Sequence, residues 1–252
     1  FGAGWNQDYG LLEHMAVSSV ETLENLRGSK YIQSYVGKSY EKIKNFIVQG
    51  KRILFVGTPC QVAGLKSMVK NENLYTVDLI CHGIPSMLVF RKYLASKIGT
   101  RKIKEFSFRD KEFGWNKYGI KIKTDDDYIY HSIYKFDPFM VGYLRNLYLN
   151  KVCYSCPFSD MPRVGDITLG DFWGVDKKYY DQNGVSAVIV NNVHGQKLFE
   201  KIVLNNAVQV FETNIETIAN YNKRLVNGQC SIPVFRNETL TELVNYNFDY
   251  IE

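Results

Sequence analysis

The chain has 252 residues, 45% of them hydrophobic, and a formal net charge of +5 at pH 7. This length suffices for one large domain or two small ones, and the composition is typical of a globular protein. Because no run of about 18 apolar residues occurs and the positive charge is dispersed, we expect neither a membrane span nor a nucleic-acid partner.

The five cysteines are the most informative part of the composition. Their number is odd, and the first residues, Phe1 to Trp5, show no secretory leader, so a disulfide framework is disfavoured. We therefore expect a cytoplasmic protein whose cysteines serve metal or redox chemistry.

A strand, a tight turn and a helix are predicted in the first third of the chain. Residues 51–57 are rich in strand formers, and residues 60–69 have the apolar spacing of a helix. Thr58 is a good N-cap, and Pro59 suits the first helical position. This pattern places Cys60 in the first turn of the helix.

A second strand, residues 73–80, runs into Cys81 and is followed by a predicted helix over residues 86–97. The order strand, helix, strand predicts a right-handed parallel crossover, in which both strands end at the same edge of the sheet. Ligands of open α/β sheets bind at that edge. We therefore expect Cys60 and Cys81 to lie there together.

The middle third predicts an antiparallel meander of three strands, over residues 104–109, 118–124 and 128–133. Later in the chain, helices are expected over residues 138–149, 195–204 and 239–250, and strands over residues 166–169, 186–191 and 207–212. The predicted fold class is α/β, with a mixed sheet that has a parallel strand–helix–strand portion and an antiparallel meander. We expect a single domain over residues 1–252.

Cys153 and Cys156 form a C-x-x-C pair just after a predicted helix. Two intervening residues let both sulfurs face one centre, as in metal and cluster sites, although dithiol redox enzymes and zinc half-sites use the same spacing. Cys60, at the start of a helix, is in a position that favours the thiolate, the form that ligates iron. Together with Cys81, these residues favour a 4Fe–4S cluster. Zinc is an alternative that the uneven spacing disfavours, and Cys230 is interpreted as structural.

Residues 165–174 form a second candidate site, in which two Gly-Asp pairs bracket a short strand and a Phe-Trp pair follows. Glycines admit a flat ligand close to the backbone, carboxylates accept from ribose or ribityl hydroxyls, and aromatic rings stack on a ring system. The alternative is a strand with turn glycines and a core tryptophan. Arg109 suits either a cofactor phosphate or a salt bridge, and His82 either a catalytic proton donor or a structural residue.

Several of these segments resemble the coenzyme F-420 hydrogenase/dehydrogenase beta subunit family. The resemblance rests on residues 57–65, 77–86, 153–156 and 165–174, with further similarity at residues 28–34 and 107–115. It implies a flavin-containing iron–sulfur oxidoreductase that passes electrons between a 4Fe–4S cluster, FAD and a deazaflavin-like or other hydride carrier.

The resemblance also implies roles for residues of this chain. The expected cluster ligands are Cys60, Cys81, Cys153 and Cys156. The residues expected to border the flavin are Thr58, Pro59, Gln61, Asp166, Thr168, Asp171, Phe172 and Trp173. Relatives often carry a ferredoxin-like domain ahead of this region, so we expect a fragment without that module. Its expected partners are a ferredoxin-like domain or protein and a hydride-carrier or small-molecule substrate.

Two other functions also fit the sequence. A non-catalytic binding or assembly module would keep the fold, with or without a structural metal, but would bind no flavin. An enzyme that uses Cys60 as a nucleophile, activated by its helix, is the third alternative.

Overall fold

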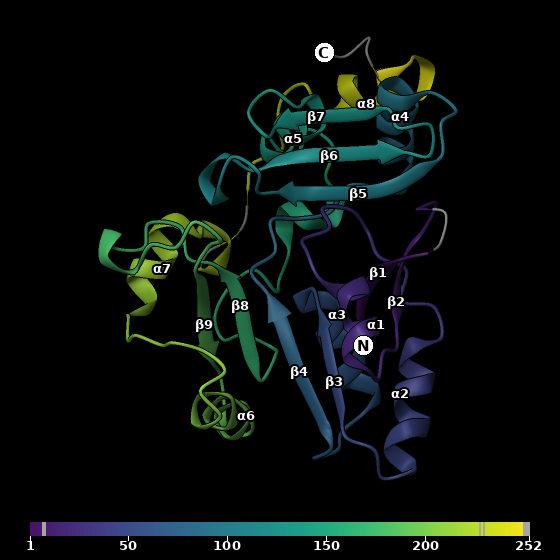
Figure 1. The fold of residues 1–252 in the computed structure, drawn as a ribbon. Helices are drawn as coiled ribbons and strands as arrows, with labels where there is room; N and C mark the ends of the chain where they lie inside the picture. The colour runs from purple at the N-terminus through teal and green to yellow at the C-terminus, as the bar shows by residue number, and fades with distance from the viewer. Residues whose placement is uncertain (7–8, 227, 229, 249–252) are drawn as a thin grey trace.

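The computed structural model describes residues 1–6, 9–226, 228 and 230–248, and it contains three sheets (Figure 1). The first is the pair β1 (Gly2–Trp5) and β2 (Leu12–Met15). The second has four strands in the order β3 (Ile53–Gly57), β4 (Leu74–Leu79), β8 (Ile167–Asp171) and β9 (Ser186–Val190). The third is the meander β5 (Ile103–Asp110), β6 (Gly119–Thr124) and β7 (Ile129–Ile133).

Eight α-helices are described between and around the strands. They are α1 (Val20–Leu23), α2 (Ser39–Val48), α3 (Pro59–Met68), α4 (Met87–Ile98), α5 (Pro138–Leu144), α6 (Val193–Leu204), α7 (Ile215–Tyr221) and α8 (Arg236–Asn245). No helix in the described part of the chain is both long enough and apolar enough to cross a membrane.

The four-stranded sheet is mixed, which confirms the predicted fold class. β3 and β8 both run parallel to β4, whereas β9 pairs antiparallel with β8. Gly57 at the end of β3 lies opposite Asp78 in β4, so the segments that follow the two strands leave from the same edge, as predicted. Side chains of β3, α2 and α3 form a buried core that includes Ile43, Phe55, Val62 and Leu65.

The meander is confirmed and packs against α4 and α5 (Figure 1). Alternate strand residues face this second core because successive side chains of a strand point to opposite faces. Its fully buried members include Phe108, Ile120 and Ile122 from the strands, Phe90 from α4 and Phe139 from α5.

The helix expected over residues 138–149 is shorter than predicted, because α5 ends at Leu144. Asn146 follows with a φ of 62°, a left-handed conformation that terminates the helix. The chain then turns back, and the Tyr148 hydroxyl donates to the carbonyl of Phe139. Gly142 lets the Tyr148 ring lie against the helix, since a Cβ at that position would overlap it.

Two other predicted elements differ from the structure. Residues 207–212 were expected as a strand but form none, and Phe211 stacks on Tyr179 instead, with ring centroids 3.8 Å apart. Val208 and Val210 are exposed, so Phe211 alone of these apolar side chains packs against the protein. The last helix, α8, covers residues 236–245 instead of 239–250, and residues 249 and 250 lie outside the described residues.

Candidate functional site

Cys60 lies in the first turn of α3, as the sequence predicts. Thr58 is the N-cap, and its backbone N–H donates to Oε1 of Gln61 over 3.0 Å, which fixes the turn between β3 and α3. Pro59 occupies the first helical position. The Cys60 side chain is exposed, and its sulfur lies 3.1 Å from Oγ1 of Thr58.

Cys81 begins the loop that leaves β4, and this loop is fixed against the segment that carries Cys153. Gly83 adopts a φ of 123°, and a Cβ on it would lie 3.3 Å from Cβ of Cys153, so the two segments approach closely only because residue 83 is glycine. The N–H of Asn150 donates to the Ile84 carbonyl over 2.8 Å.

Cys153 lies in the 3-10 helix Lys151–Ser155, and Cys156 follows it directly. The N–H of Cys153 donates to the Asn150 carbonyl over 2.8 Å. The carbonyl of Cys156 accepts from Oγ of Ser159 over 3.0 Å. Both halves of the C-x-x-C pair are therefore held by local backbone contacts.

Cys60, Cys153 and Cys156 all lie close enough to Cys81 to affect the ionisation of its thiol. Burial raises the pKa of the Cys81 thiol to about 12, and the charges that Cys60, Cys153 and Cys156 carry as thiolates contribute to the rise. Burial, with the charges of Cys156 and Cys60, likewise raises the pKa of Cys153. Thiolates gathered in this way repel one another, so a bound cation is needed to hold all four deprotonated.

The spacing of the four sulfurs is wider than that of a closed zinc site. Within the described residues, no three cysteine sulfurs lie within 4.8 Å of one another. Tetrahedral zinc with Zn–S bonds of about 2.3 Å would place each pair of sulfurs about 3.8 Å apart. A cluster that offers a separate iron to each thiolate accommodates ligands at greater separation, so the donor set fits an iron–sulfur group.

His82 contacts the aromatic core beside the cysteines. Its Nε2 lies 3.2 Å from the Tyr143 carbonyl, and the two rings are 4.8 Å apart. Burial, followed by the charge of Arg224, lowers the pKa of His82, so the ring is neutral near pH 7. A neutral His82 donates this hydrogen bond from Nε2, so His82 has a structural role at this position.

A chain of aromatic rings leads away from the Cys81 loop. The Tyr143 hydroxyl donates to the Gly83 carbonyl over 3.1 Å, and the Tyr143 ring stacks on Tyr31 with centroids 5.2 Å apart. Tyr31 in turn meets the edge of Phe108 at 5.6 Å.

Arg109, which the sequence assigns to a phosphate or a salt bridge, is paired within the protein. Its Nη1 lies 2.9 Å from Oδ2 of Asp171, and its guanidinium lies over the rings of Tyr118 and Trp173. Trp115 stacks on Trp173 at 4.6 Å and donates from Nε1 to Asp171. Arg109, Asp171 and Trp173 therefore form one ion-pair and aromatic cluster.

Asp166 and Thr168 lie in a separate buried network. Asp166 accepts from the N–H and hydroxyl of Thr76, both over 2.8 Å, and from Nδ2 of Asn192 over 3.0 Å. Burial opposes its ionisation, but these hydrogen bonds outweigh burial and the pKa of Asp166 is lowered. Thr168 is fully buried and donates to Asp78.

Phe172 is also remote from open space, since it is buried in a small core with Ile218 and Leu225. Of the eight residues expected to border a flavin, Asp166, Thr168 and Phe172 are thus engaged inside the protein. The sequence pattern of Gly-Asp pairs does not distinguish a ligand site from such a network.

A polar cavity of about 470 Å³ adjoins the aromatic chain, and none of the site residues expected from the sequence lines it. Lys30 and Ser107 are among its lining residues, and so is Phe108, which contacts Tyr31. Burial lowers the pKa of Lys30 to about 8, although its Nζ donates to the carbonyls of Leu26 and Arg27. The only signal in the sequence was the family-like pattern at residues 28–34 and 107–115, which the fold brings together at this cavity.

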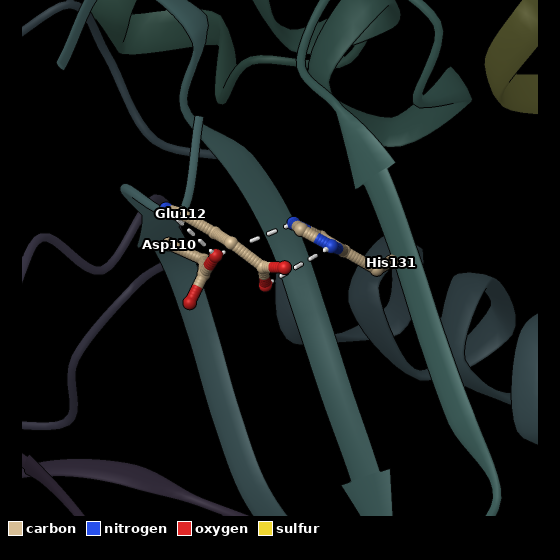
Figure 2. Close-up of side chains that lie close together, drawn as sticks. All are labelled: Asp110, Glu112 and His131. Carbon is tan, nitrogen blue, oxygen red and sulfur yellow. Dashed lines mark hydrogen bonds and ion pairs between the residues drawn. The ribbon is translucent and has the colours of Figure 1, made fainter. Parts of the chain in front are cut away.

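A second group of ligand-type side chains lies on the meander (Figure 2). Nε2 of His131 lies 3.3 Å from Asp110, and Nδ1 lies 3.7 Å from Glu112. Lys121 Nζ lies 2.6 Å from Glu112 and 4.0 Å from Asp110, so one ammonium is already paired with these two carboxylates. The imidazole faces one carboxylate with each nitrogen, which is the geometry of an ion-pair network between strands.

Comparison with known proteins gives one family and one fold. The family of the C-terminal region of the coenzyme F420 hydrogenase/dehydrogenase beta subunit matches residues 50–215. A similar solved structure is a chain of the xenon-derivatised F420-reducing [NiFe] hydrogenase complex from Methanosarcina barkeri. The TM-score is 0.57 at 15% sequence identity, over 98% of this chain and 81% of that one, which establishes similarity of fold. No curated protein matches the sequence.

Proposed function

This chain belongs to the coenzyme F420 hydrogenase/dehydrogenase beta subunit family, and we therefore propose that it is an electron-transfer oxidoreductase domain. In this proposal Cys60, Cys81, Cys153 and Cys156 hold a 4Fe–4S cluster. An FAD lies nearby and exchanges electrons with a deazaflavin-like or other hydride carrier. When bound, the cluster supplies single-electron transfer and the flavin couples single electrons to hydride transfer.

One observation carries the proposal: Cys60 and the pair Cys153 and Cys156, from two other segments of the chain, all lie close enough to Cys81 to raise the pKa of its thiol. If Cys81 were buried only by chance, there would be no reason for three other cysteines to lie beside it. The arrangement leaves Cys60 exposed at one side, which gives an entry path for iron and sulfide.

We propose the 470 Å³ cavity as the place where part of the flavin binds. This volume lies within the range of about 300–1,000 Å³ that is usual for ligand sites. Lys30 supports an anionic ligand there, since it is a cation inside a polar cavity. Phe108, Tyr31 and Tyr143 connect the cavity wall to the Cys81 loop by successive ring contacts.

Residues beside the cysteines and beside the aromatic rings are proposed to hold the site in place. Thr58, Pro59 and Gln61 fix the turn beside Cys60, and the Arg109–Asp171 pair orients Trp173 and Tyr31. His82 is the proposed proton donor, and because burial lowers its pKa it must first take up a proton before it can give one.

A ferredoxin-like domain or protein is the proposed electron partner. A cytoplasmic location also remains a proposal, and it is supported by five cysteines that are all free thiols, because reducing compartments keep thiols free.

Anaerobic reconstitution tests the proposal. We expect about four irons and about four sulfides per chain, with the broad visible absorption of an iron–sulfur centre, and FAD binding at micromolar concentration. Stoichiometric zinc without iron would overturn the cluster. Iron uptake without binding of FAD or FMN would instead favour the non-catalytic binding or assembly module.

A further inference from the structure

Arg224 lies beside the C-x-x-C segment although it is far from it in sequence. It is in the 3-10 helix Lys223–Leu225, which is anchored on one side by Leu225, a fully buried residue. On the other side, Nδ2 of Asn222 donates to the Asp171 carbonyl over 3.0 Å. These two anchors fix the direction in which Arg224 projects.

The guanidinium of Arg224 bonds to the cysteine segment and to the fifth cysteine. Nη1 donates to the Cys153 carbonyl over 3.2 Å and also to the Gly228 carbonyl, and Nη2 donates to Sγ of Cys230 over 2.9 Å. Cys230 is joined to the same segment, because its N–H donates to the Tyr154 carbonyl. Arg224 therefore joins Gly228 and Cys230 to the segment that carries the C-x-x-C pair.

We propose that Arg224 is a positioning residue that fixes the C-x-x-C segment and whose charge makes a cluster bound there easier to reduce. The inference rests on the proposed function, since it concerns a cluster held by the same four cysteines. It also assigns Cys230 a role, as the sulfur that orients Arg224.

The charge of Arg224 is directed at the cysteine site. Among the ion pairs of the described residues, none involves Arg224, so no carboxylate there neutralises it. Its charge lies at the site, because Nη1 is in direct contact with the Cys153 carbonyl. Reduction adds a negative charge to a cluster, and a nearby cation stabilises the reduced form.

Lys223 supplies a matched control on the same helical turn. It is exposed and carries the same formal charge, but no hydrogen bond or ion pair joins it to the cysteine segment within the described residues. Replacing either residue by glutamine removes one positive charge. The two variants should therefore differ only if the effect depends on the contacts that Arg224 makes with the cysteine segment.

The test is a redox titration of the reconstituted full chain, with the reduced cluster detected by electron paramagnetic resonance. At the wild-type midpoint we expect Arg224→Gln to lower the ratio of reduced to oxidised cluster about tenfold, a shift of 59 mV for a one-electron couple. Lys223→Gln should shift the midpoint much less. Arg224→Lys keeps the charge and should restore most of the wild-type midpoint.

A glutamine variant whose midpoint equals that of the wild type, or moves no further than that of Lys223→Gln, would overturn the inference. So would a lysine variant shifted as far as the glutamine variant. If Arg224→Gln takes up less iron, its remaining clusters still report a midpoint, and Arg224→Lys provides the second reading. A wild-type chain without any cluster signal refutes the proposed function instead, which distinguishes the two failures.

Discussion

Arg163 and Asp78 form an ion pair that is completely buried, with 2.8 Å between Nη2 and Oδ1 and no exposed surface on either side chain. Asp78 also accepts from the N–H of Gly165 and the hydroxyl of Thr168. The pair therefore joins β4 to the segment that enters β8, three residues before Cys81.

We expect Asp78→Asn to destabilise the protein by about 3–5 kcal/mol, because it leaves the Arg163 charge buried and unpaired. Urea unfolding followed by circular dichroism measures this change in the free energy of unfolding. Glu24→Gln removes one partner of an exposed pair with Arg27 and should leave stability near that of the wild type. Equal stability of the two variants would contradict the structural role of Asp78.

His14 makes the stability of the fold depend on pH. It is 5% exposed, stacks on Phe55 at 5.0 Å and hydrogen-bonds to Val56 and Ser34. Burial lowers its pKa from 6.5 to about 4, so the unfolded chain binds a proton that the folded chain excludes between those values. The contribution of His14 is complete above pH 6.5 and is lost as the pH falls toward 4.

Between pH 7 and pH 4.5 we therefore expect His14 to account for a loss of about 2–3 kcal/mol in the free energy of unfolding. Urea unfolding at the two pH values measures the loss. His14→Gln has no group that titrates in this range, so its stability should fall less over the same interval. A variant with the same pH dependence as the wild type would show that other groups cause it.

The four candidate ligands should differ from the fifth cysteine in iron binding. We expect serine at position 60, 81, 153 or 156 to lower the iron content well below about four per chain, because each removes one thiolate of the cluster. Cys230→Ser keeps an acceptor for Arg224 and should retain wild-type iron. Iron and sulfide analysis after anaerobic reconstitution measures both results, and iron loss on Cys230→Ser alone would show that the ligand set is wrong.

Lys30 should make flavin binding depend on pH. Because burial lowers its pKa to about 8, its charged fraction falls about tenfold between pH 7 and pH 9. If the charge binds a flavin phosphate in the cavity, the affinity for FAD should fall by about the same factor. Quenching of FAD fluorescence at constant ionic strength measures the affinity.

Two variants of the cavity control this measurement. Lys30→Met should bind FAD weakly at both pH values, with the pH dependence removed. Lys104→Met removes another cation that lines the cavity and should weaken binding while the dependence remains. An unchanged pH profile in Lys30→Met would place the flavin elsewhere.

Elements with strong local signals were predicted well from the sequence. Thr58, Pro59 and Gln61 specify the turn into α3 locally, and all three have the expected roles in the structure. β1 was missed because its sequence, Gly-Ala-Gly-Trp, has weak strand propensity and depends on pairing with β2. The helix α2 was missed although Ile43 and Ile47 have the spacing of a buried helical face.

The site was predictable only where it follows from sheet topology. The parallel order of β3 and β4 places Cys60 and Cys81 at one edge, whereas the position of Cys153 depends on its packing against Gly83. Arg224 contacts Cys153 across 71 residues of sequence, and no local pattern marks such a contact. Asp166 and Thr168 are expected at a cofactor from the sequence because a buried hydrogen-bond network contains the same types of polar residue as a cofactor site.

The pairing of β4 with β8 joins two segments that are far apart in the chain. Asp78 and Thr168 are neighbours in the sheet but are 90 residues apart in the chain, with the whole meander between them. Contacts of such long range form late, because a large loop must close before they contribute stability. A nascent chain that has emerged only as far as β7 has the first two cysteines without the C-x-x-C pair, so the complete thiol set can assemble only after the whole meander has been synthesised.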